Sequence, residues 1–122
     1  MKKQGILQAA LAEAIAGMGH TDLLVIADAG LPAPPGVPCI DLAVRCGLPP
    51  MLDVASAVAD ELQVETLIVA DELLDRETAL PDALRQLHEG VDWVLDRQPM
   101  VLLAWVATLA LTVCTGRYNC AR

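Results

Sequence analysis

The amino-acid sequence predicts an α/β fold with a mixed or mostly parallel sheet, helices on both of its faces and an atypical apolar segment at the carboxyl end. Two observations lead to this prediction. Short apolar runs alternate with segments in which apolar residues recur every three or four positions, which is typical of strands joined by crossover helices. The 122 residues are also enough for one domain with a sizeable core.

The first half of the chain contains one predicted helix and two predicted strands. Residues 7–17 show helical spacing of apolar side chains, namely Leu7, Leu11, Ile15 and, just beyond, Met18. Residues 23–27 form an apolar run bounded by polar and glycine residues, which predicts a buried strand. A loop rich in Pro and Gly follows over residues 29–38, and residues 39–44 alternate well enough to predict a second strand.

The second half repeats this alternation. Apolar side chains at helical spacing predict a helix over residues 51–62, with Asp53 near its positive end. Residues 64–70 are rich in β-branched side chains and predict a strand. A third helix is predicted over residues 80–89, and a fourth strand over residues 91–95.

The composition excludes several classes of partner. The formal net charge of −8 argues against nucleic acid and against an anionic membrane, so a neutral small molecule fits better. The four cysteines include no CxxC pair and no histidine at zinc spacing, which argues against a metal site and against a secreted disulfide framework. Reduced thiols and a poor signal peptide at the amino end predict a cytoplasmic protein.

The two residues best suited to chemistry bracket the first strand. His20 precedes the strand, and its imidazole can give or take a proton near neutral pH. Asp28 follows the strand, and an ionised carboxylate accepts several hydrogen bonds from hydroxyl groups. Plainer roles stay open for both residues, because a histidine can cap a helix end and an aspartate can bond its own backbone in a turn.

Several segments resemble the D-ribose pyranase family, from residue 1 to about residue 95. The longest are Gly17-Met18-Gly19-His20-Thr21-Asp22 and Ala27-Asp28-Ala29-Gly30-Leu31-Pro32; shorter ones are Met1-Lys2-Lys3, Ile40-Asp41-Leu42-Ala43, Val64-Glu65 and Ala70-Asp71-Glu72. The related fucose mutarotases carry a similar histidine block. The fucose mutarotases differ from this chain in the residue that follows the histidine and in the residues that follow Asp-Ala, so the resemblance favours the ribose branch of the family.

The resemblance implies an isomerase of ribose catabolism that interconverts the pyranose and furanose forms of D-ribose without a cofactor. It implies that His20 is the proton donor, that Asp28 binds the sugar, and that the protein forms a ring-shaped homo-oligomer with sites near subunit contacts. Tyr118 and Asn119 loosely match the family's last substrate-binding block. The alternatives are a mutarotase for fucose or another monosaccharide, and an inactive sugar-binding or assembly protein.

The carboxyl end departs from this family pattern. All 16 acidic residues lie at or before Asp96, and the family's second histidine is missing. We therefore divide the chain into a ribose-pyranase-like domain, residues 1–98, and an apolar tail, residues 99–122. The tail is either part of the same domain or the product of a shifted reading frame or truncation. Residues 100–116 carry no charge and, taken alone, are also a candidate for a short membrane span.

Overall fold

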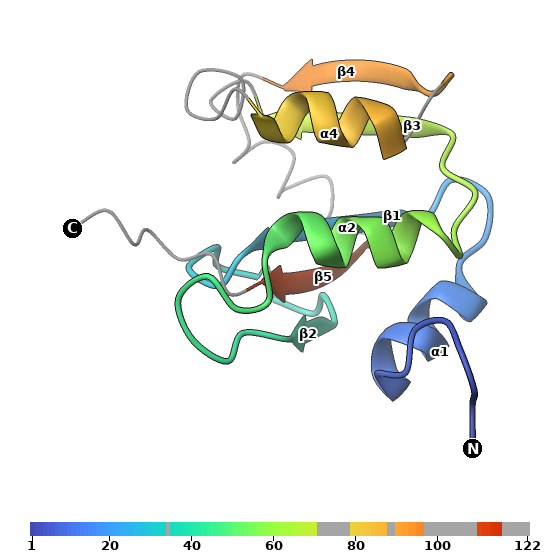
Figure 1. The fold of residues 1–122 in the computed structure, drawn as a ribbon, viewed down its shortest axis with the longest axis vertical. Helices are drawn as coiled ribbons and strands as arrows, with labels where there is room; N and C mark the ends of the chain where they lie inside the picture. Colours follow the sequence, from blue (N-terminus) through green and yellow to red (C-terminus); the bar gives the residue numbers. More distant parts are fainter. Residues whose placement is uncertain (34, 71–78, 88–89, 97–109, 116–122) are drawn as a thin grey trace.

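The computed structural model describes residues 1–33, 35–70, 79–87, 90–96 and 110–115. Figure 1 shows the order of the helices and strands in these residues. They are α1 (Ala9–Gly17), β1 (Leu23–Asp28), β2 (Cys39–Asp41), α2 (Met51–Ala59), β3 (Thr66–Ala70), α4 (Ala79–Leu87), β4 (Asp92–Asp96) and β5 (Ala110–Thr115). Each of the three helices and four of the five strands in the described residues overlap a segment for which the sequence predicts that element.

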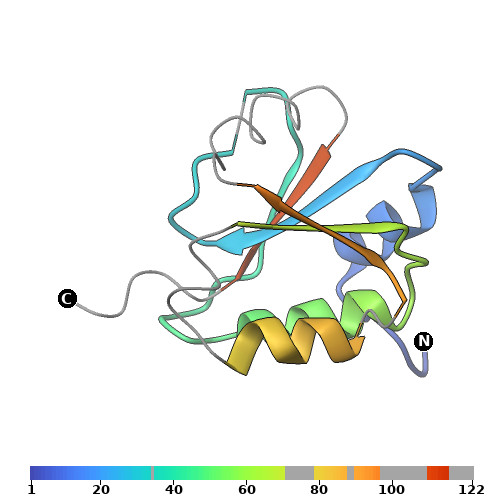
Figure 2. The same ribbon diagram turned by 90° about the horizontal axis from the view of Figure 1, so that it is seen from above.

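The described strands pair in parallel throughout. One sheet has the order β1-β5-β2, and a second sheet pairs β3 with β4. The predicted α/β class is confirmed. Figure 2 shows that α2 and α4 lie on the same side of the strands.

The strand β5 lies between β1 and β2, and the sequence-based prediction missed it. Leu23 of β1 is in register with Ala110, and Asp28 with Thr115. The strand belongs to the uncharged stretch 100–116, in which no strand is predicted, although Thr112, Val113 and Thr115 have the β-branched side chains that favour strands. The hypothesis of a shifted reading frame stays a prediction.

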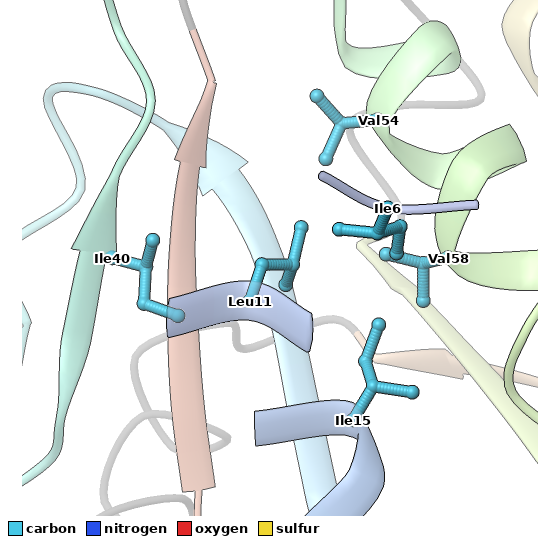
Figure 3. Packing of buried hydrophobic residues seen from close by; sticks show 6 residues of the cluster. All are labelled: Ile6, Leu11, Ile15, Ile40, Val54 and Val58. Carbon is cyan, nitrogen blue, oxygen red and sulfur yellow. The ribbon is translucent and has the colours of Figure 1, made fainter. Parts of the chain in front are cut away.

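The main hydrophobic core connects α1, α2, β2 and the amino-terminal segment (Figure 3). Its buried residues are Ile6, Leu11, Ile15, Ile40, Val54 and Val58. Leu11 and Ile15 are four positions apart and therefore share one face of α1. Leu7 was predicted on this apolar face, but it precedes the helix and is 68% exposed, and Ile6 is buried instead.

A second, smaller cluster connects the two sheets through their helices. Ala55 of α2 and Leu84 of α4 are buried against each other. Leu67 of β3 and Ile26 of β1 pack against them, and Ile26 also packs against the main core. The position of β3 relative to β1 is therefore set by apolar packing under α2 and α4.

The amino-terminal segment is fastened to the end of α2 by Glu61. The Ile6 N–H group donates a hydrogen bond to Glu61 Oε1. Lys2 Nζ lies 3.8 Å from the same oxygen and donates to the carbonyl of Ile6 at 2.9 Å. These contacts hold the chain where the Ile6 side chain enters the core.

We expect Gly5→Ala to lower the free energy of unfolding by about 2 kcal/mol. An alanine in the left-handed conformation costs ~1–2 kcal/mol, and its Cβ atom also weakens the hydrogen bond from the Ile6 N–H group to Glu61. Gly5 has φ +78°, and a Cβ atom there would overlap Glu61 Oε1. Urea unfolding measures the change.

Gly17→Ala is the matched control. Gly17 is helical, and nothing lies within 4 Å of a Cβ added there. Alanine should therefore stabilise the helix by roughly 0.5–1 kcal/mol. Equal effects of the two substitutions would contradict the proposed clash.

The structure also bears on two further predictions, the candidate membrane span and the reduced thiols. Among the described helices, none has the length and apolar character to cross a membrane, and residues 110–115 of the candidate span form β5. Cys46 takes part in a disulfide, so the prediction of reduced thiols is wrong at this residue.

Candidate functional site

His20 lies in a tight turn that joins α1 to β1. The helix ends at Gly17, and the turn is closed when the Asp22 N–H group donates to the carbonyl of Gly19 at 3.2 Å. The Asp22 carboxylate accepts a hydrogen bond from the Gly19 N–H group at 2.7 Å. Asp22 therefore closes the turn on Gly19 with both its N–H group and its carboxylate. The carboxylate bonds the backbone and not the imidazole of His20.

Thr21 gives this turn an unusual backbone. Its φ is 75°, and it is the single non-glycine residue with positive φ in the described part of the chain. Turns with positive φ at the third position favour glycine there, and a β-branched residue is strained. Strain of this kind often accompanies functional positions. Here it falls on the residue directly after His20.

The His20 side chain is paired with Glu65. The His20 Nδ1 atom lies 2.6 Å from Glu65 Oε1. Glu65 directly precedes β3, just as His20 precedes β1 by a few residues. The pair therefore connects the amino ends of two strands from different sheets, and Figures 1 and 2 show these two strand ends on the same side of the molecule.

Both members of this pair face solvent. The exposed fractions of the side chains are 77% for His20 and 59% for Glu65. An ion pair this exposed contributes only about 0–1 kcal/mol to stability. Its main physical effect is therefore on the orientation of the imidazole, which remains accessible to a molecule from outside.

Asp28 is the last residue of β1, at the end of the strand opposite to His20. The strand covers Leu23 to Asp28, and a rise of about 3.3 Å per residue separates the Cα atoms of these two residues by roughly 16 Å. His20 lies before the strand and turns toward Glu65. Within one copy of the chain, the structure does not bring His20 and Asp28 together.

The other predicted substrate-binding residues, Tyr118 and Asn119, lie outside the described residues. Asp41, a further acidic residue of the family-like segments, accepts a hydrogen bond from the Ala43 N–H group at 2.9 Å, which is a local turn contact. Within the described ranges, His, Cys, Asp and Glu side chains form no cluster suited to a metal ion.

No motif or spacing in the sequence marks Glu65 as a site residue. It belongs only to the short family-like segment Val64-Glu65. It is 45 positions from His20, and no local periodicity relates residues so far apart. Only the packing of β3 near β1 reveals the pair.

Comparison with known proteins gives matches over most of the chain. The model of the RbsD / FucU transport protein family matches residues 1–114, so the match continues past residue 95 and covers β5 except for its last residue, Thr115. A "D-ribose pyranase" of Symbiobacterium thermophilum is 53% identical over 91 residues, which are 75% of this chain and 70% of that protein. Another "D-ribose pyranase", from Pseudomonas putida, is 53% identical over 88 residues, which are 72% of this chain and 64% of that protein.

A solved structure has the same fold. It is described as the structure of Bacillus subtilis RbsD complexed with D-ribose, and it matches with a TM-score of 0.85 at 38% sequence identity. The match covers 97% of this chain and 89% of that one.

Proposed function

The chain belongs to the RbsD / FucU transport protein family, and on this premise we propose that it is a D-ribose pyranase. Such an isomerase interconverts the pyranose and furanose forms of D-ribose by acid–base ring opening and closure. The observation that carries the proposal is the match, over 97% of the chain, to a protein solved in complex with D-ribose. Relatives 53% identical that are named for the same activity support it.

The interconversion requires only proton transfers from the protein. A base removes the proton of the anomeric hydroxyl while an acid donates a proton to the ring oxygen, O5, and the C1–O5 bond breaks. The open-chain aldehyde then rotates. The O4 hydroxyl adds to C1, a proton leaves O4 and another reaches the aldehyde oxygen. The furanose therefore has the same atoms as the pyranose. Groups that exchange protons near neutral pH are sufficient for both steps.

We assign the proton-donor role to His20. Its imidazole is held at Nδ1 by Glu65 and is largely exposed, so the Nε2 atom can reach a bound sugar. We assign sugar binding to Asp28, with Tyr118 and Asn119 as further substrate ligands. A carboxylate that bonds sugar hydroxyls discriminates strongly against a ligand that lacks them.

The separation along β1 favours a site built from two copies of the chain. Roughly 16 Å of strand is longer than a monosaccharide ring, so His20 and Asp28 of one copy cannot easily hold the same sugar. The family resemblance implies a ring-shaped homo-oligomer with sites near subunit contacts. In such a ring, His20 of one copy meets Asp28 of its neighbour.

Saturation-transfer NMR on D-ribose tests the proposed activity. The protein should accelerate exchange between the pyranose and furanose anomers, and the dependence on ribose concentration gives kcat and KM. Faster exchange with L-fucose than with D-ribose would favour the fucose mutarotase alternative. Ribose binding without accelerated exchange would contradict the enzyme and favour an inactive sugar-binding protein.

Mixing two inactive variants tests the shared site. His20→Asn and Asp28→Asn should each be inactive alone. If each site takes one residue from each of two copies, random co-assembly restores about a quarter of the sites, because half of the copies supply each intact residue. Recovery should therefore approach a quarter of the wild-type exchange rate. No recovery after verified co-assembly would contradict a site shared in this way.

A further inference from the structure

We propose that Glu65 is a positioning residue for His20, which selects the tautomer of the imidazole and directs its Nε2 atom to the substrate. This inference rests on the proposed function and deepens it. The carboxylate of Glu65 lies 2.6 Å from Nδ1 of His20. Hydrogen bonds between charged nitrogen and oxygen groups are short, about 2.7–2.9 Å, and this contact is at least as short.

The chemistry of the two groups sets the direction of this bond. An ionised carboxylate can only accept hydrogen bonds, so the proton in the contact belongs to Nδ1 of His20. The neutral imidazole then carries its single proton on Nδ1 and presents the Nε2 lone pair as a base. The imidazolium form presents an Nε2–H group as an acid. In both forms, Nε2 is the atom that exchanges protons with the sugar.

The surrounding backbone makes the imidazole dependent on this one contact. The Asp22 carboxylate accepts a hydrogen bond from the Gly19 N–H group. In the described ranges, no side-chain contact of His20 other than that with Glu65 is seen. His20 lies in a strained turn beside Thr21, with 77% of its side chain exposed. Without Glu65, the ring would be free to rotate and to take either tautomer.

Glu65 also ties this acid–base group to the second sheet. It directly precedes β3, whose Leu67 packs under α2 and α4. The backbone position of Glu65 is therefore set by the packing between the sheets and not by the His20 turn itself. A partner held by a separate element helps to align a general acid–base group.

Two readouts on the full-length protein test the proposal. In ¹⁵N–¹H correlation spectra of the neutral imidazole, His20 should be protonated at Nδ1 in the wild type. In Glu65→Ala it should shift to the Nε2–H tautomer that free histidine prefers. The same variant should lower kcat for ribose exchange about tenfold with KM nearly unchanged, as expected when alignment of an acid–base group is lost. Glu65→Gln keeps an acceptor oxygen without charge and should recover part of the tautomer selection and of kcat.

Glu13→Ala is the matched control, since Glu13 is an exposed carboxylate on α1, and it should change neither readout. An Nε2–H tautomer in the wild type would overturn the proposal. An unchanged kcat in Glu65→Ala would overturn it as well. The NMR readout needs no turnover, so a wild-type protein that fails to accelerate exchange refutes the proposed function separately from the His20–Glu65 arrangement.

Discussion

His20→Asn is expected to lower kcat for ribose ring exchange by about 10²-fold or more, the lower end of what a positioned acid–base group contributes. Asparagine keeps a polar side chain of similar reach but cannot exchange a proton near neutral pH. The side chain is exposed, so the fold should be unaffected. The change in kcat is measured by saturation-transfer NMR, with KM determined from the ribose dependence.

The control for this substitution is His88→Asn, which changes the only other histidine of the chain. It should retain the wild-type exchange rate. A His20→Asn protein that exchanges ribose as fast as the wild type would remove the assigned proton donor. The ring-opening activity would then have to be carried by other groups.

Leu11→Ala is expected to lower the free energy of unfolding by about 3 kcal/mol, within the range of roughly 2–5 kcal/mol for buried Leu→Ala changes. Leu11 is 3% exposed and belongs to the main core with Ile6, Ile15 and Val58. The loss combines the transfer of the removed atoms with the cavity that they leave. Urea unfolding at fixed protein concentration measures it, because assembly would make stability depend on concentration.

Leu7→Ala provides the matched control for Leu11→Ala. Leu7 is the same residue type four positions earlier, but 68% of it is exposed. Its replacement should change the free energy of unfolding by less than about 0.5 kcal/mol. Similar losses for the two variants would contradict the packing of α1 described above.

Most elements could be predicted because their signals are local. The helical spacing of Leu11 and Ile15 and the apolar run from Leu23 depend only on neighbouring residues. The prediction that Leu7 shares the apolar face of the helix is wrong for a related reason. The helical spacing of apolar residues continues to Leu7, although the helix begins only at Ala9. Before Ala9, the hydrogen bond from the Ile6 N–H group to Glu61 fixes the path of the chain.

The candidate site was predicted only in part. The residues around His20 and Asp28 resemble a known family closely enough to assign them roles, and these roles stay predictions. The sequence places both residues beside one strand. The structure confirms that strand as Leu23–Asp28, and its length of roughly 16 Å means that one copy alone does not hold His20 and Asp28 together.

By itself, the sequence determined the α/β class, the order of most elements and the resemblance to ribose pyranases. Only the tertiary structure decided that β5 lies between β1 and β2, and that Glu65 meets His20 across 45 positions of sequence. The physical reason is that side-chain periodicity and short motifs are set over a few residues. Strand order and contacts between distant loops depend instead on how the apolar faces of α2, α4, β1 and β3 pack together.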